Sequence, residues 1–123
     1  MSVTYERTGG FAGMRQRLEI SSDKVKLTDR RAGTRERALA KDEAARLDAL
    51  VKKAKAVPFR APQGGGRVSD AFTLKLWLDD EGEPRATMST VAMPLEGSDG
   101  TPWGDLLAFA DGMLAAELEA LKK

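Results

Sequence analysis

The chain has 123 residues, of which 41% are hydrophobic and 32% are charged, a balance typical of one globular domain with its own core. Its 20 lysines and arginines against 19 aspartates and glutamates give a net charge of +1, which favours neither nucleic acid nor an anionic membrane as partner. Cysteine and histidine are absent, which excludes disulfides and thiolate zinc sites and removes the commonest general base.

Residues 1–11 lack the apolar core of a secretion signal. No apolar run approaches the ~20 residues that cross a bilayer, and Asp111 and Glu117 interrupt even the apolar C-terminal segment. We therefore expect a cytoplasmic protein that has no membrane partner.

The first part of the chain predicts three antiparallel strands. Residues 3–7, 14–20 and 24–27 alternate apolar and polar side chains with the two-residue period of a strand that has one solvent-exposed face. Gly9-Gly10 allows the chain to reverse between the first two, because positive φ costs glycine little. Lysines on the third segment are typical of an edge strand.

A loop and a helix are expected next. Residues 30–37 are rich in arginine and show no apolar periodicity, which indicates a loop. Residues 41–55 carry an apolar stripe at helical spacing, with acidic residues at the start and lysines at the end, as the helix dipole prefers. Prolines and glycines in residues 58–66 end this helix and indicate a connection within the domain.

The second half predicts another hairpin and a second helix. Residues 72–78 and 85–91 are expected to be paired strands, and residues 106–121 carry the leucines of a helix. Neither half of the chain can bury a core alone. We therefore predict a single α+β domain over residues 1–123, with an antiparallel sheet of about five strands packed by two helices in the order βββαββα.

Two segments resemble ligand sites, but each has a simpler interpretation. Residues 79–81, Asp-Asp-Glu, suit calcium or a catalytic carboxylate pair, yet a hairpin turn needs the same polar residues beside a glycine. Residues 64–66, Gly-Gly-Gly, lack the ending of a phosphate loop and precede a strand instead of a helix. We therefore expect no metal, no cofactor and no small-molecule ligand.

The two tryptophans and the arginine-rich segment leave alternatives open. Trp77 lies opposite the leucine face of its strand, so it is either packed under a helix or exposed as a partner anchor. Trp103 is expected to pack against the last helix. The arginines of the expected loop either form a solvated surface or contact a partner. Among partners, an acidic protein is favoured over nucleic acid, because no aromatic residues are interleaved with these arginines. These arginines are Arg30, Arg31, Arg35 and Arg37.

The connection Gly9-Gly10-Phe11-Ala12-Gly13 carries the clearest functional signal. Its glycines allow a bend that holds a large apolar side chain at or near the tip, where ordinary hairpins prefer asparagine or aspartate. Phe11 either anchors in the pocket of a partner or folds back over the open end of its own sheet. The local pattern leaves both possibilities open.

This motif and three further patterns resemble the emfourin family, which comprises small bacterial and archaeal protein inhibitors of protealysin-like, thermolysin-type metallopeptidases. The resemblance covers most of the chain, although residues 30–37 and 98–103 are additions to the family's outline. The further patterns are Leu47-x-x-Leu50-Val51-x-x-Ala54, Asp70-x-Phe72-x-Leu74-x-Leu76 and a leucine-rich last helix.

The resemblance implies an inhibitor that occludes the active-site cleft of a cytoplasmic zinc protease, with Gly9, Gly10, Phe11, Ala12 and Gly13 as the partner-binding residues. Thermolysin-like enzymes favour a large apolar residue just after the scissile bond, which Phe11 would supply. Two alternatives remain: a non-catalytic protein-binding or scaffold domain that uses the arginine-rich loop, and an enzyme that uses the carboxylates of residues 79–81.

Overall fold

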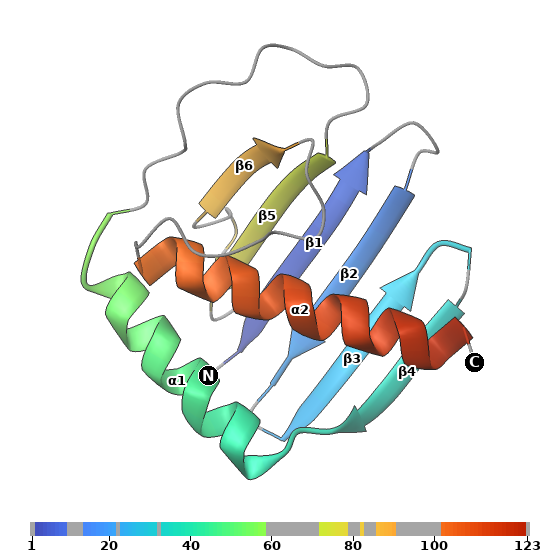
Figure 1. The fold of residues 1–123 in the computed structure, drawn as a ribbon, viewed down its shortest axis with the longest axis horizontal. Coiled ribbons are helices and arrows are strands. Elements are labelled where there is room, and N and C mark those ends of the chain that lie inside the picture. The colour runs from blue at the N-terminus through green and yellow to red at the C-terminus, as the bar shows by residue number, and fades with distance from the viewer. Residues whose placement is uncertain are drawn as a thin grey trace.

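The fold is an α+β domain in which an antiparallel sheet is packed by two helices, as the sequence predicts (Figure 1). The computed structural model describes residues 2–9, 14–21, 23–31, 33–58, 72–78, 82, 86–90 and 102–122. The strands are β1 (Val3–Gly9), β2 (Met14–Ile20), β3 (Lys24–Asp29), β4 (Gly33–Ala38), β5 (Phe72–Leu78) and β6 (Ala86–Thr90), and the helices are α1 (Lys41–Lys55) and α2 (Pro102–Lys122).

The sheet has the strand order β4-β3-β2-β1-β5-β6, and every neighbouring pair is antiparallel. β1 is therefore an interior strand, although it begins the chain. It pairs with β2 through a register that runs from Val3 opposite Ile20 to Gly9 opposite Met14. The expected first hairpin is confirmed, and its closed end lies at the same end of the sheet as the turn between β3 and β4 (Figure 1).

The sequence predicts a loop over residues 30–37, and this prediction is wrong from Gly33 onward. Arg30 and Arg31 do form a turn, but Gly33–Ala38 is a sixth strand, β4, at the edge of the sheet. Gly33 begins it with φ of 107°, a conformation that costs glycine little. No apolar alternation marks this strand because its half-buried positions hold Arg35 and Arg37.

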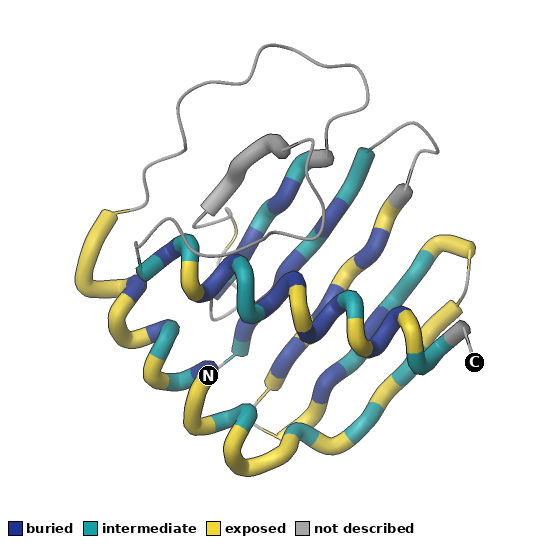
Figure 2. Tube along the Cα trace, viewed as in Figure 1, coloured by how far each residue is buried: buried dark blue, intermediate teal, exposed yellow. Residues whose placement is uncertain are grey.

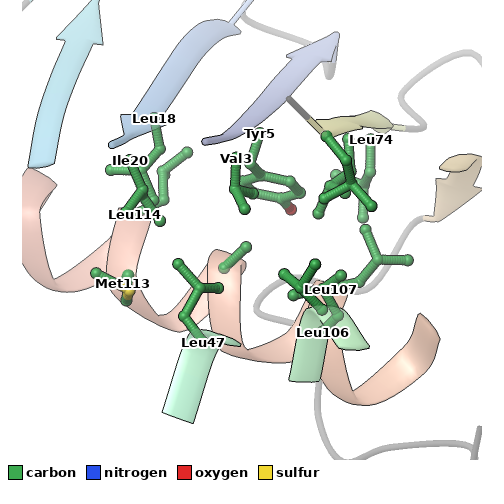
Figure 3. Close-up of a cluster of buried hydrophobic side chains, with 14 of the residues drawn as sticks. Val3, Tyr5, Leu18, Ile20, Leu47, Leu74, Leu106, Leu107, Met113 and Leu114 are labelled. Atoms are coloured by element: carbon green, nitrogen blue, oxygen red, sulfur yellow. The ribbon is translucent and has the colours of Figure 1, made fainter. Parts of the chain in front are cut away.

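Both helices lie on one face of the sheet, and α2 crosses the strands while α1 packs beside it (Figure 1). Along β2, β3 and β5, buried positions alternate with half-buried or exposed ones (Figure 2), as expected when every second side chain faces this layer. Figure 3 shows Val3 and Tyr5 pointing from the sheet toward Leu106 and Leu107 of α2. Neither described helix is long and apolar enough to cross a membrane.

The expected apolar stripe of α1 is confirmed, since Leu47, Val51 and Ala54 are buried in the shared core. α2 begins earlier than expected, at Pro102, which suits a first helical position because its missing N–H is not needed there. Trp103 follows it, is buried, and donates its indole N–H to the backbone oxygen of Val57 at 2.8 Å. The structural interpretation of Trp103 is therefore confirmed, and it links the start of α2 to the end of α1.

Candidate functional site

The candidate site is the end of the sheet at which the β1–β2 hairpin closes. Of the five residues expected to bind a partner, Gly9 is described, whereas Gly10, Phe11, Ala12 and Gly13 lie outside the described residues. Gly9 ends β1 with φ of 100°, a conformation that side chains with a Cβ rarely adopt. The requirement for glycine at the entry to this connection is therefore conformational.

A buried arginine lies two residues before Gly9. Arg7 is 7% exposed and stands opposite Gln16 in the β1–β2 register, on the face covered by the helices. Its Nε donates to Gln16 Oε1 at 2.8 Å, and its Nη1 donates to Asp111 Oδ1 of α2 at 3.0 Å. The arginine thus joins both strands of the hairpin to the helix above them.

Asp111 accepts a second hydrogen bond from the core of the sheet. The Tyr5 hydroxyl donates to Asp111 Oδ1 at 2.8 Å, and both residues are fully or almost fully buried. Burial, followed by the charge and the hydrogen bond of Asp111, raises the pKa of Tyr5 well above its ordinary range, while the positive charge of Arg7 opposes this. Tyr5 therefore stays a neutral donor to the carboxylate.

Gln16 extends this chain of polar contacts toward the next turn. Its Nε2 donates to Asp29 Oδ2 at 2.9 Å, and Asp29 Oδ1 accepts the backbone N–H of Arg31 at 2.8 Å. We call this set the polar row. It joins α2, β1, β2 and the β3–β4 turn at one end of the sheet, and its members are Tyr5, Asp111, Arg7, Gln16 and Asp29.

The polar row was not predicted from the sequence, although a signal for it exists. Gln16 occupies a core-facing position of an otherwise apolar alternation, and Asp111 interrupts the apolar stripe of the last helix. Buried polar residues need hydrogen-bond partners, so each position requires a complementary group elsewhere in the fold. Their pairing depends on where α2 crosses the sheet, which local patterns do not specify.

Two of the four arginines in the expected loop belong to a second, half-buried cluster. Arg37 donates to both carboxylate oxygens of Glu43, at 2.8 and 2.9 Å, and also to Glu117 of α2. Arg35 Nε lies 3.8 Å from Glu117 Oε2. The hydrogen bond from Arg37 lowers the pKa of Glu43, against an opposing effect of burial. These contacts hold β4 to the helices. The other two arginines of the segment, Arg30 and Arg31, are exposed.

Trp77 lies on the face of the sheet opposite the helices, so the first of its two alternatives, packing under a helix, is wrong. It stands opposite Thr4 in the β1–β5 register and is partly buried. The guanidinium carbon of Arg17 lies 5.9 Å from the centre of its ring, which is a cation–π contact. Arg17 and neighbouring strand residues therefore shield Trp77 in part, without a covering helix.

The segments that resemble ligand sites, residues 64–66 and 79–81, lie outside the described residues. Within the described ranges, no three Asp or Glu side chains lie close enough together to hold a metal ion. The buried charged residues of this part are paired, Arg7 with Asp111 and Glu117 with the half-buried Arg37. Such pairs hold the strands and helices in fixed relative positions.

These features define a class: an α+β domain in which a buried arginine, Arg7, joins both strands of the β1–β2 hairpin to the helix above them. Comparison with known proteins adds no assignment. No protein-family model matches the chain, and no curated protein matches it.

Proposed function

We propose that this chain is a non-catalytic inhibitor that binds the active-site cleft of a protealysin-like, thermolysin-type zinc metallopeptidase through Gly9, Gly10, Phe11, Ala12 and Gly13. The observation that carries the proposal is the attachment of both hairpin strands to α2 through Arg7. A hairpin that is held in place before binding loses little conformational entropy when it docks. The emfourin-like motif supports the choice of partner.

In this proposal the inhibitor contributes shape and no chemistry. Phe11 fills the apolar pocket that receives the residue after the scissile bond, and the glycines around it let the backbone approach the cleft closely. Gly9 supports this geometry, since its positive φ directs the chain out of β1. The protease is blocked because the occupied cleft excludes its substrate.

The test is to incubate the purified protein with a protealysin-like enzyme and to follow cleavage of a peptide substrate. We expect activity to fall in proportion to the inhibitor added and to reach zero near one equivalent. Full activity in excess inhibitor would remove the proposal. Turnover of a substrate by this chain alone would instead support an enzyme.

The alternative is a protein-binding or scaffold domain for another intracellular partner, with the arginine-rich segment as its contact. Exposure of Arg30 and Arg31 at the β3–β4 turn favours it, whereas Arg35 and Arg37 are engaged with Glu117 and Glu43. The alternative therefore depends on the two arginines at the turn. It predicts binding to a partner that has no protease cleft.

A further inference from the structure

Three exposed arginines gather at the end of the sheet where the β1–β2 hairpin closes. Arg30 donates its backbone N–H to the backbone oxygen of Arg15 at 3.2 Å, which places the β3–β4 turn directly beside the start of β2. Arg31 follows Arg30 in the same turn, and all three residues are exposed. Arg15 also lies next to Met14, the partner of Gly9 in the last pair of the hairpin.

Two of these three arginines, Arg15 and Arg30, have no carboxylate partner among the described residues. By contrast, Arg17 pairs with glutamates and Lys24 pairs with Glu36. Asp29 is the nearest carboxylate along the chain, and its oxygens accept hydrogen bonds from Gln16 and from the backbone of Arg31. Within the described part of the chain, Arg15 and Arg30 therefore place two unpaired positive charges side by side at this end, in a chain whose net charge is only +1.

The backbone that carries these arginines is fixed by the polar row. Asp29 ties the turn to Gln16, and Gln16 is bound to Arg7, the residue that secures the hairpin to α2. The turn that carries Arg30 and Arg31 is thereby joined to both strands of the β1–β2 hairpin.

We infer that Arg15, Arg30 and Arg31 are a docking site for an acidic protein surface, namely carboxylates beside the cleft that receives the hairpin. The inference rests on the proposed function, because that cleft supplies the partner. Exposed charges at the rim of an interface mainly accelerate association, by drawing the partner into the correct orientation. Nucleic acid is disfavoured because its binding draws on a strongly basic surface, and the net charge of the chain is only +1.

The first experiment measures association with a protealysin-like enzyme by stopped flow over a range of salt concentrations. The variant R15Q/R30Q/R31Q is compared with K41Q/K53Q/K55Q, which removes the same charge from exposed positions of α1. We expect the arginine variant to associate about 10-fold more slowly at low salt, with a weaker salt dependence. The lysine variant should resemble the parent. Equal association rates for both variants, with inhibition intact, would overturn this inference alone.

The second experiment does not require a protease. The 15N-labelled protein is titrated with an octaglutamate peptide and separately with oligothymidylate, and amide shifts are followed by NMR. We expect octaglutamate to shift the amides of Arg15, Arg30 and Arg31 and to bind more tightly than oligothymidylate. Shifts centred on α1, or tighter binding of the oligonucleotide, would overturn the inference. A chain that binds octaglutamate here yet inhibits no protease would overturn only the proposed function.

Discussion

The Arg7 guanidinium and the Asp111 carboxylate lie 104 positions apart in the sequence and 3.0 Å apart in the fold, and the side chains are 8% and 1% exposed. Removing two charges from water is costly, so the pair is favourable only while both members and their further hydrogen bonds are present. Asp111 has the Tyr5 hydroxyl and Arg7 has Gln16 as additional partners. Loss of either charge leaves the other buried without compensation.

Asp111→Ala should therefore lower the free energy of unfolding by ~3 to 5 kcal/mol, the usual cost of leaving a buried charge unpaired. Urea denaturation measures this. Asp48→Ala, which removes an exposed partner of Lys52, is the matched control and should cost less than ~1 kcal/mol. The double variant Arg7→Met/Asp111→Ala should be less destabilised than the sum of its single changes. Additive costs would show that the two side chains do not interact.

Tyr5 should titrate only at very high pH in the folded protein. It is the single tyrosine of the chain, so tyrosinate absorbance near 295 nm reports on it alone. Its pKa is raised in the folded state, whereas the unfolded chain loses the proton near the ordinary value of 10.0. The resulting stability is present below pH 10 and falls as the pH rises above it. The fall should be absent in Tyr5→Phe, and a normal titration in the folded protein would contradict the buried hydrogen bond.

The arginines of the segment 30–37 should divide into two groups by their effect on stability. Arg37→Gln should cost ~2 kcal/mol, because the buried Glu117 loses one charged hydrogen bond and Glu43 loses two. Arg30→Gln changes an exposed turn residue and should leave the melting temperature within experimental error of the parent. Thermal unfolding of both variants checks this. Equal destabilisation by the two changes would contradict the position of β4.

Phe11→Ala should separate an anchor from a core residue. If Phe11 enters the pocket of the protease, inhibition should weaken by ~2 kcal/mol or more while the melting temperature is nearly unchanged. If it packs on its own sheet, the change should instead cost ~3 to 5 kcal/mol of stability. Inhibition constants and thermal unfolding, measured on the same preparation, distinguish the two results.

Gly9→Val tests the backbone geometry that Phe11 depends on. A β-branched residue is strained at the observed φ of 100°, so the end of the hairpin should be distorted. We expect inhibition to be lost although no contacting side chain has been removed. Full inhibition by this variant, together with full inhibition by Phe11→Ala, would place the contact elsewhere.

The sequence by itself determined the elements whose side chains alternate or repeat locally. The β1–β2 hairpin follows from a period of two around Gly9, and α1 follows from apolar residues at helical spacing, because each pattern reflects a face turned toward one core. Such patterns need no knowledge of what covers that face. They also define the α+β class.

Only the tertiary structure decided which charged side chains turn toward the helices. β4 carries Arg35 and Arg37 at its inner positions, and their partner Glu117 is 80 positions away from Arg37. The same holds for Arg7 and Asp111. A charge is tolerated inside a fold only when an opposite charge reaches it. Because the crossing of α2 over the sheet creates that proximity, the sequence pattern of β4 resembled a solvated loop until the fold was known.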